Sequence, residues 1–205
     1  MMMEKRRMVI ATHNGHKTGE FRALLGEGWV VEDLTAHPEL PVPEEDGATF
    51  EENAGIKARS AGERLGVGVL VVADDSGLEV AALGGRPGIF SARYAGPGAG
   101  DGKNRELVLQ EMVGVADRRA RFVCVLAVAR GAEVVARFRG TVEGRLTAEG
   151  VGDGGFGYDP IFIPEGYEAT FGELPLTVKN RLSHRARALA KLMRWMQDAE
   201  LTEGR

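Results

Sequence analysis

The chain has 205 residues, which suits one domain or two closely joined lobes and excludes a long multidomain array. Hydrophobic residues make up 43% and charged residues 27%, so we expect a folded, soluble protein with a real core. The 26 basic and 30 acidic residues give a net charge of -4, the opposite of the basic surface that non-specific nucleic-acid binding requires. We therefore expect no nucleic-acid polymer as a partner.

The single cysteine, Cys124, lies in the apolar run 122–129 and is predicted to be a small buried hydrophobe. An intramolecular disulfide is impossible with one cysteine. No apolar stretch approaches the ~18 residues that a bilayer span needs. We therefore expect a cytoplasmic protein with no membrane partner.

The first third of the chain predicts one strand, a helix, a loop and a second helix. Residues 8–11 predict a strand, and after the polar stretch 12–17 a helix should carry Phe21, Leu24 and Leu25 on one face. Residues 36–49 predict a loop, since they hold three prolines and an acidic group. A capping box at 49–52 then opens a helix whose apolar residues are Phe50, Ala54, Ala58, Ala61 and Leu65.

The rest of the chain begins with the apolar run 69–73, which predicts a buried strand that delivers Asp74 to Gly77 at its end, with 78–83 as a further strand. A Gly/Pro-rich loop is predicted at 84–102 and a helix at 104–112. A long hairpin of two strands follows at 121–129 and 134–145. Residues 150–164 predict a glycine-rich loop that leads into a short strand. The last helix is predicted from Leu182, Ala186, Leu189, Met193 and Met196.

A candidate phosphate site lies at 12–17, where a strand ends and a helix with an early lysine begins. Its residues are Thr12, His13, Asn14, Gly15, His16 and Lys17. Backbone N–H groups, the helix dipole and the ammonium of Lys17 can hold phosphate at such a turn. The segment is not a P-loop, because Ala11 and His16 stand where that motif needs glycine. The alternative is an ordinary strand-to-helix turn with a solvated lysine.

Carboxylates gather in two segments, at Asp74–Asp75 and in the acidic group Glu44, Glu45 and Asp46. Oxygen ligands of this kind suit a hard cation such as magnesium. The alternative gives Asp74–Asp75 a capping or turn role and leaves the glutamates solvated. With one cysteine and four histidines, a zinc site at His13 and His16 is not expected.

Two further segments combine polar, basic and aromatic residues. Residues 179–185 place Lys179, His184 and Arg185 next to the last predicted helix, where the helix dipole favours negative groups over cations. A ligand that is negative or accepts hydrogen bonds would explain them, and a solvated basic turn is the alternative. In residues 156–162, aromatics beside glycines suit either a core or the stacking of a flat base.

Six motifs in this order closely resemble the Ham1-like family of inosine/xanthosine triphosphate pyrophosphatases. They are Thr-x-Asn-x-x-Lys (12–17), Thr-Phe-x-Glu-Asn-Ala (49–54), Ala-Asp-Asp-Ser-Gly-Leu (73–78), Pro-Gly-x-x-Ser-Ala-Arg-Tyr (87–94), Gly-Gly-Phe-Gly-Tyr-Asp-Pro-Ile-Phe (154–162) and Lys-Asn-x-Leu-Ser-His-Arg (179–185). The resemblance spans about residues 8 to 197. It implies an α/β fold, with residues 1–205 forming one domain in which a long mixed sheet joins two lobes around a cleft.

The resemblance also implies an activity: magnesium-dependent hydrolysis of non-standard purine nucleoside triphosphates (ITP, dITP and XTP) to monophosphate and pyrophosphate, usually by a homodimer. Such an enzyme cleanses the nucleotide pool before deaminated purines enter DNA or RNA. A nucleotide-binding regulatory module and a Maf-like pyrimidine triphosphate pyrophosphatase are the rival hypotheses. The acidic residues argue against the first, and the 156–159 and 183–185 segments against the second.

Carried onto this sequence, the resemblance implies roles for individual residues. Asp75 would be the general base and a metal ligand, with Glu44 as the second ligand and adjacent Glu45 as the alternative, because the family's loop varies there. Lys57 would join 12–17 in holding phosphate. The remaining substrate-binding positions would be Ser76, Phe156, Gly157, Tyr158, Asp159, Lys179, His184 and Arg185. His13 and His16 stand where the family varies, which leaves their contribution open.

Overall fold

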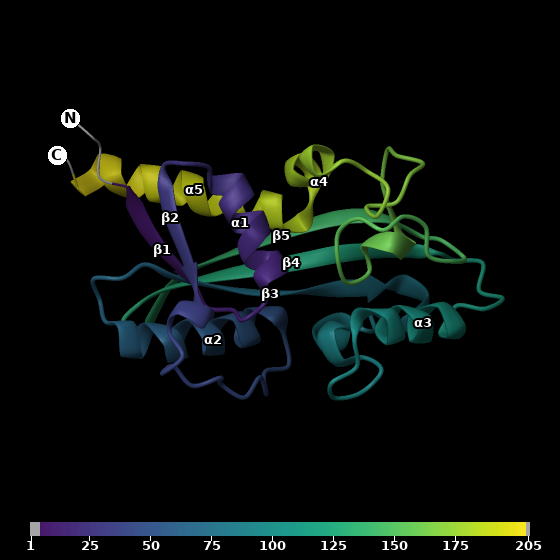
Figure 1. Cartoon of the computed structure of the whole chain (residues 1–205), viewed down its shortest axis with the longest axis horizontal. Coiled ribbons are helices and arrows are strands. Elements are labelled where there is room, and N and C mark those ends of the chain that lie inside the picture. The colour runs from purple at the N-terminus through teal and green to yellow at the C-terminus, as the bar shows by residue number, and fades with distance from the viewer. Residues whose placement is uncertain (1–4, 204–205) are drawn as a thin grey trace. The chain divides into compact units, whose positions relative to one another are not determined.

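The computed structural model describes residues 5–203, which form a mixed six-stranded sheet flanked by helices (Figure 1). The sheet order is β2-β1-β3-β4-β5-β6, so the predicted α/β class is confirmed. The strands are β1 Arg6–Ile10, β2 Trp29–Asp33, β3 Val71–Val80, β4 Arg119–Arg130, β5 Glu133–Leu146 and β6 Phe162–Pro164. The α-helices are α1 Gly15–Leu25, α2 Phe50–Leu65, α3 Asp101–Glu111, α4 Leu176–Leu182 and α5 His184–Glu203. Short 3₁₀ helices are Leu34–Ala36, Ala81–Leu83, Gly88–Arg93 and Asp159–Ile161.

Strand directions explain why the sheet is mixed. β1 pairs in parallel with β2, where Val9 lies opposite Glu32. It also pairs in parallel with β3, where Val9 lies opposite Val71. A parallel pair needs a crossover connection, and α1 supplies it between β1 and β2. β6 instead pairs antiparallel with β5, Arg145 opposite Ile163.

The described chain divides into two compact units. The first, unit 1, holds the described residues up to 75, then 125–139 and those from 188 on; the second, unit 2, holds 76–124 and 140–187. In Figure 1, α2 and α5 lie on opposite sides of the strands of unit 1, and α3 and α4 on opposite sides of those of unit 2. Each unit therefore buries its strands between helices.

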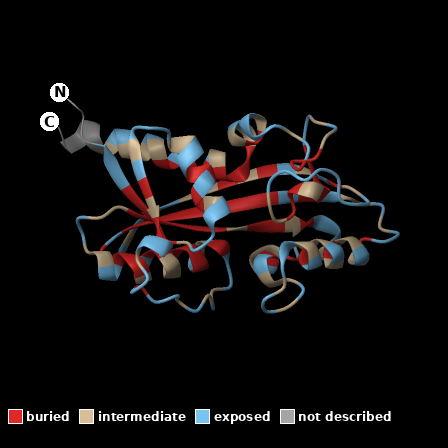
Figure 2. Ribbon diagram, in the orientation of Figure 1, coloured by how far each residue is buried: buried red, intermediate tan, exposed pale blue. Residues whose placement is uncertain are grey.

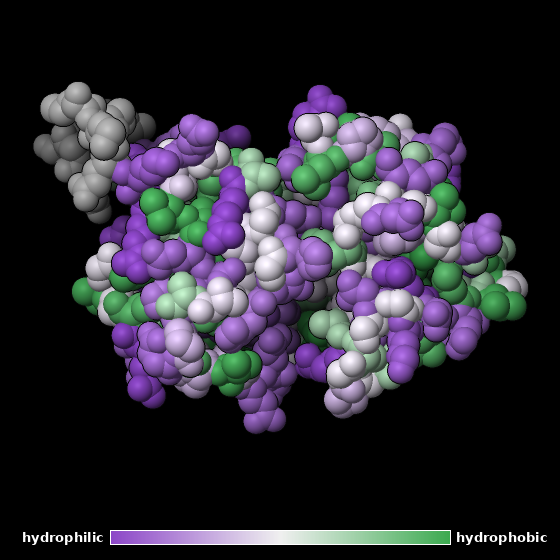
Figure 3. All heavy atoms as spheres, in the orientation of Figure 1, coloured by the Kyte–Doolittle hydropathy of each residue, from purple (hydrophilic) through white to green (hydrophobic). Residues whose placement is uncertain are grey.

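Burial is concentrated in the central strands, which Figure 2 shows as largely red ribbons. Residues 122–129 of β4 are all buried, including Cys124 as predicted. Hydrophilic residues predominate on the face shown in Figure 3, where hydrophobic residues form small separate groups. Within the described residues, no helix combines the length and apolar composition that a membrane span requires.

β3 corrects the prediction that a strand ends at residue 73. It continues through Asp74, Asp75 and Ser76 to Val80, so 78–83 is not a separate strand. Both aspartates are buried inside the sheet, at 1% and 7% exposure. A buried carboxylate requires a charged or hydrogen-bonding partner, and two lysines described below supply it, which allows the strand to continue through them.

Other differences concern short or interrupted elements. β2 was not predicted, because its residues 29–33 show little alternation and only two of them are buried. The Gly/Pro-rich segment 84–102 contains a six-residue 3₁₀ helix at 88–93. Ser183 adopts an extended conformation, which separates α4 from α5. The predicted hairpin 121–145 and the short strand before Pro164 are confirmed as β4, β5 and β6.

Candidate active site

A cluster of paired charges lies at the buried part of β3 that belongs to unit 1. Lys17 Nζ, from α1, lies 2.5 Å from Asp74 Oδ1 and 3.5 Å from the Asp74 carbonyl oxygen. Lys57 Nζ, from α2, lies 2.6 Å from Asp75 Oδ1 and 3.2 Å from Glu45 Oε2. Neighbouring aspartates of one strand are thus matched to lysines from different helices.

Asn14 builds the start of α1 and brings Lys17 to this cluster. Its side-chain oxygen accepts the backbone N–H groups of His16 at 2.9 Å and Lys17 at 3.2 Å, and its own N–H donates to Thr12 Oγ1 at 3.1 Å. Asn14 is therefore an N-cap residue, which satisfies donors that a helix start leaves without partners. Both N–H groups donate to Asn14 Oδ1, so a phosphate would have to share or replace that contact. His13, Gly15 and His16 are exposed.

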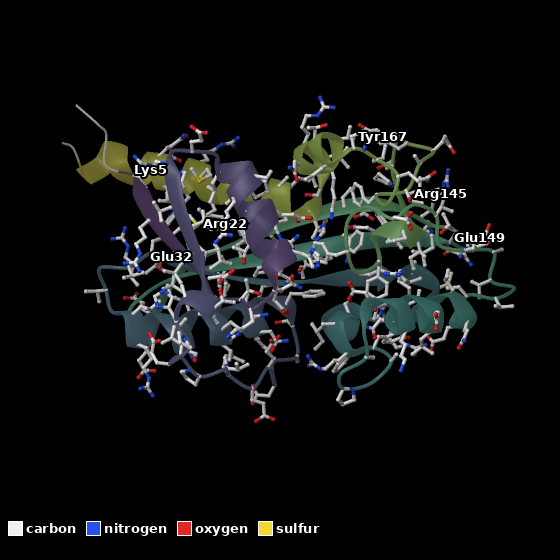
Figure 4. The ribbon with its side chains drawn as sticks, viewed as in Figure 1. Lys5, Arg22, Glu32, Arg145, Glu149 and Tyr167 are labelled. Atoms are coloured by element: carbon white, nitrogen blue, oxygen red, sulfur yellow. The ribbon has the colours of Figure 1, made fainter. Side chains whose placement is uncertain are left out.

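Side chains of unit 1 hold α1 on β2. The guanidinium of Arg22, labelled in Figure 4, donates to the carbonyl oxygen of Val31 at 3.0 and 3.1 Å. Thr18 Oγ1 donates to Asp33 Oδ2 at 2.7 Å, and both side chains are buried. These contacts fix the helix whose first turn carries Lys17.

The acidic loop reaches the cluster through Glu45. Glu45 is half-buried and paired with Lys57, whereas Glu44 is exposed. A cavity of about 210 Å³ opens beside this pair. Its lining comes from the end of β1, the acidic loop and α2: Ala11, Thr12, His13, Leu34, Pro41, Val42, Pro43, Glu45, Lys57 and Ala61. The geometry therefore favours Glu45 over Glu44 as the partner of Asp75.

The environment of Asp75 makes its carboxylate unusual. Burial raises the pKa of Asp75 above its ordinary value, and the attraction of Lys57 and Lys17 does not cancel that effect. Burial lowers the pKa of Lys57, but the charges of Asp75 and Glu45 outweigh it, so the net direction is upward and the lysine stays charged. The second oxygen, Asp75 Oδ2, is buried and has no hydrogen-bond partner within the described residues.

The carboxylates of Asp75 and Glu45 suit a magnesium ion that shares its ligands with water and substrate, not a metal enclosed by protein ligands alone. Among the residues described, no three His, Cys, Asp or Glu side chains gather into a group that could hold a metal. Mg²⁺ is commonly held by one or two carboxylates together with waters and substrate phosphates. Asp75, one of whose oxygens has no partner among the residues that the structure describes, and nearby Glu45 meet that requirement.

Aromatic and basic side chains form a second cluster in unit 2. Arg185 Nη2 donates to Ser76 Oγ at 3.0 Å, and the Arg185 guanidinium lies 5.8 Å from the centre of the Phe156 ring. Lys179 Nζ lies 4.8 Å from the same ring centre. Phe156 is half-buried, while Lys179 and Arg185 are almost fully buried. Cations near a half-buried ring suit the stacking of a flat base and donation to its edge.

The carboxylate of Asp159 holds this second cluster together. Asp159 Oδ2 accepts Lys179 Nζ at 2.5 Å and the backbone N–H of Phe156 at 2.8 Å. The ion pair is buried on both sides, with each side chain 3% exposed. Removing either partner alone would leave a buried charge uncompensated. Asp159 therefore supports Phe156 and Lys179 from within the protein.

Two predicted substrate-binding side chains make contacts with the protein instead. Tyr158 is 4% exposed, and its hydroxyl donates to the carbonyl oxygen of Ser91 at 2.8 Å. Burial raises the pKa of Tyr158 and keeps this hydroxyl protonated. His184 is buried and stacked on Phe122, with ring centres 4.8 Å apart and planes 12° from parallel. A direct role for either side chain in binding substrate stays a prediction.

Sequence reasoning gave no individual role to Asp74 or Ser91, although both lie in the six motifs. Ser91 Oγ accepts the N–H of Leu78 at 2.9 Å, beside Gly77. A Cβ on Gly77 would lie 2.4 Å from both Ser91 Oγ and the carbonyl oxygen of Gly88, so only glycine permits this approach. Gly77 and Ser91 each lie in one of the six motifs, and that was the signal in the sequence. The motifs do not indicate that Ser91 accepts the N–H of Leu78 or that it lies against Gly77.

Comparison with known proteins gives consistent matches. The model of the Ham1 family matches residues 8–195. A dITP/XTP pyrophosphatase from Halalkalibacterium halodurans is 49% identical over 191 residues, which cover 92% of this chain and 97% of that protein. The structure of the Staphylococcus aureus Ham1 protein is similar with a TM-score of 0.84 and 38% identity, over 95% of this chain and 100% of that one. The structure of a HAM1 protein from Coxiella burnetii is similar with a TM-score of 0.83 and 38% identity, over 94% of this chain and 99% of that one.

Proposed function

Because the chain belongs to the Ham1 family, as its motifs predict, we propose that it is a magnesium-dependent pyrophosphatase of non-standard purine nucleoside triphosphates. It hydrolyses dITP, ITP and XTP to the monophosphate and pyrophosphate, which removes deaminated purines from the nucleotide pool. The observation that carries this proposal is the buried Asp75 carboxylate, held by Lys57 at one oxygen and lacking a hydrogen-bond partner within the described residues at the other. Relatives named dITP/XTP pyrophosphatases supply the substrate class.

Residues of unit 1 carry the reaction at the triphosphate in this proposal. Lys17, Lys57 and the first turn of α1 bind phosphate oxygens, while Asp74 keeps Lys17 in place. Asp75 accepts the proton of the attacking water, and its raised pKa brings it closer to neutral pH, where a general base works best. Asp75 and Glu45 would hold Mg²⁺, which supplies charge neutralisation on the phosphate oxygens when bound.

Residues of unit 2 recognise the base. Phe156 stacks on the purine ring, and Arg185 or Lys179 donates to the 6-keto oxygen of hypoxanthine or xanthine. Adenine carries an amino group at that position, so buried donors would be left without an acceptor. A site that depends on such hydrogen bonds can discriminate by on the order of 10⁴. Asp159 and Ser76 keep Lys179 and Arg185 in the orientation that this donation requires.

The proposal includes a cytoplasmic site of action and, on resemblance to the family, a homodimer. Light scattering during size-exclusion chromatography tests the dimer. A mass of about twice the 22.0 kDa of one chain supports it, and a monomer at micromolar concentration removes that part of the proposal.

The activity is tested by product analysis with magnesium, in which dITP, XTP, dATP, dGTP and dTTP are supplied separately. The expected result is release of pyrophosphate, with little orthophosphate, chiefly from dITP and XTP. Turnover of dTTP instead would favour the Maf-like alternative. Tight binding of dITP without turnover would favour a regulatory nucleotide-binding module.

A further inference from the structure

Both backbone polar groups of Gly157, its N–H and its carbonyl oxygen, are bound by one face of α3. The N–H of Gly157 donates to Asp101 Oδ2 at 2.7 Å, and its carbonyl oxygen accepts Arg105 Nη1 at 2.7 Å. Asp101 and Arg105 are four residues apart, so their side chains share one face of the helix. Each hydrogen bond involves a charged group, and such bonds are shorter and stronger than neutral ones. We name this arrangement the α3 clamp.

The α3 clamp is itself fixed to the rest of unit 2. Asn104, buried between the clamp residues, accepts the N–H of Ala95 at 2.8 Å and donates to the carbonyl oxygen of Ala92 at 3.2 Å. Ser91 of the same segment accepts the N–H of Leu78 in β3 and, through its carbonyl oxygen, the hydroxyl of Tyr158. Hydrogen bonds thus connect α3 to Gly157 and, through Ser91, connect β3 to Tyr158.

The backbone at Gly157 needs this support. Its φ of +60° lies in the left-handed region, which glycine adopts readily and other residues rarely do. Glycine has no Cβ to restrict its backbone. The conformation of Gly157 is therefore held by its hydrogen bonds to Asp101 and Arg105. Phe156 precedes Gly157 directly, so a change in the backbone conformation of Gly157 would alter the position of the Phe156 ring relative to Lys179 and Arg185.

We propose that Asp101 and Arg105 are positioning residues that set the affinity and base selectivity of the Phe156 site by fixing the backbone of Gly157. This inference rests on the proposed function, because it takes Phe156, Lys179 and Arg185 as the residues that recognise the base. Neither clamp residue needs to touch the nucleotide. Small displacements of groups that orient a substrate are enough to cost on the order of tenfold in rate or affinity.

The test uses Asp101→Ala and Arg105→Ala in the full chain. Controls are Glu106→Ala and Lys103→Ala, which remove exposed charges of the same sign from the same helix. Asp101→Asn is the rescue variant, since the amide oxygen can still accept the Gly157 N–H while the charge is lost. Kinetics are measured with dITP and dATP, and amide hydrogen exchange is followed in a peptide that covers 154–162.

The α3 clamp predicts that both alanine variants raise KM for dITP roughly three- to thirty-fold with little change in kcat, and reduce the preference for dITP over dATP. Exchange in 154–162 should be faster in both, and Asp101→Asn should lie between Asp101→Ala and wild type. The two controls should match wild type in KM and exchange. A helix-stability role alone would lower the melting temperature without changing KM or selectivity.

Unchanged exchange in 154–162, or a KM for dITP equal to that of the controls, would overturn the inference. Failure of the proposed function looks different, because the wild-type chain would then hydrolyse no keto-purine triphosphate at all. In that case faster exchange in the alanine variants would still reveal the contact with Gly157, but its role in base selectivity would be refuted together with the function. If Asp101→Ala does not fold, Asp101→Asn and Arg105→Ala carry the same comparison.

Discussion

Lys57 Nζ lies 2.6 Å from Asp75 Oδ1, while the other oxygen of the same carboxylate is buried without a hydrogen-bond partner in the described part of the chain. A buried acceptor left unsatisfied costs about 1–3 kcal/mol. Asp75 Oδ2 is therefore placed where it can accept a hydrogen bond or bind a cation. Sites of this kind are often functional, since structural carboxylates are normally fully paired.

The metal ligand in the acidic loop is tested by a pair of neighbouring variants. Because Glu45 contacts Lys57 and Glu44 is exposed, we expect Glu45→Gln to raise the magnesium concentration for half-maximal activity by roughly tenfold or more. Glu44→Gln, which removes the same charge one residue away, should leave it within about twofold. A magnesium titration of dITP hydrolysis measures both, and the reverse result would restore the Glu44 assignment.

Asn14 offers a way to separate helix capping from phosphate binding. Asn14→Asp keeps a good N-cap and adds a negative charge at the helix start, so the melting temperature should change little. The same charge repels the triphosphate, and KM for dITP should rise by about tenfold or more. Asn14→Ala should instead cost about 1 kcal/mol of stability in urea unfolding.

Equal KM values for wild type and Asn14→Asp would contradict a phosphate role for this turn. A loss of stability in Asn14→Asp as large as in Asn14→Ala would contradict the capping geometry. The two readouts are independent, because one is measured with nucleotide and the other without it.

Arg185 is expected to carry discrimination at the 6-position of the purine. Arg185→Lys keeps the charge but loses the planar guanidinium that donates to Ser76 Oγ. We expect kcat/KM for dITP to fall roughly 10- to 100-fold while that for dATP changes little. Arg181→Lys, at an exposed position on α4, is the control. Equal losses for dITP and dATP would show that Arg185 does not read the base.

Tyr94 predicts a loss of stability at alkaline pH. Burial, together with the hydrogen bond from its hydroxyl to Glu111, raises the pKa of Tyr94 to about 12. Below pH ~10, the ordinary value for tyrosine, the phenol is neutral in both folded and unfolded chains. Between these values only the unfolded chain ionises, so the free energy of unfolding falls as pH rises.

Tyr94→Phe removes this ionisation, and its unfolding free energy should depend less steeply on pH above 10 than that of wild type. Urea titrations at several alkaline pH values measure both slopes, with Tyr167→Phe, at a half-buried tyrosine elsewhere in the chain, as a control. Parallel slopes for wild type and Tyr94→Phe would refute the contribution.

Patterns in the sequence predicted the elements with strong periodicity. α2 begins at Phe50 behind the N-cap Thr49, whose side chain accepts the N–H of Glu52, as the capping box indicated. The β4–β5 hairpin was equally clear, because its first strand is a long apolar run followed by a short polar turn. Local signals decide such elements, so they can be identified without knowing the rest of the fold.

Elements and contacts that depend on distant residues were not predictable. Two consecutive aspartates predicted the end of a strand, because unpaired charges are not found inside a sheet. Their pairing with Lys17 and Lys57, which are distant in sequence, allows the strand to continue. The break at Ser183 was hidden because apolar residues continue at helical spacing across it. Resemblance of motifs supplied candidate site residues, but it did not indicate that Tyr158 binds Ser91 or that Asp101 and Arg105 bind Gly157.

The central claim is tested most directly by comparing wild type with Asp75→Asn in one assay of dITP with magnesium. We expect wild type to release pyrophosphate and dIMP in equal amounts, and Asp75→Asn to lose at least about 10²-fold in kcat, since it can neither accept the proton nor bind the cation as well. Asp46→Asn, an exposed carboxylate of the acidic loop, should retain normal turnover. Near-normal pyrophosphate release by Asp75→Asn, or orthophosphate and dIDP as the wild-type products, would contradict the proposed function.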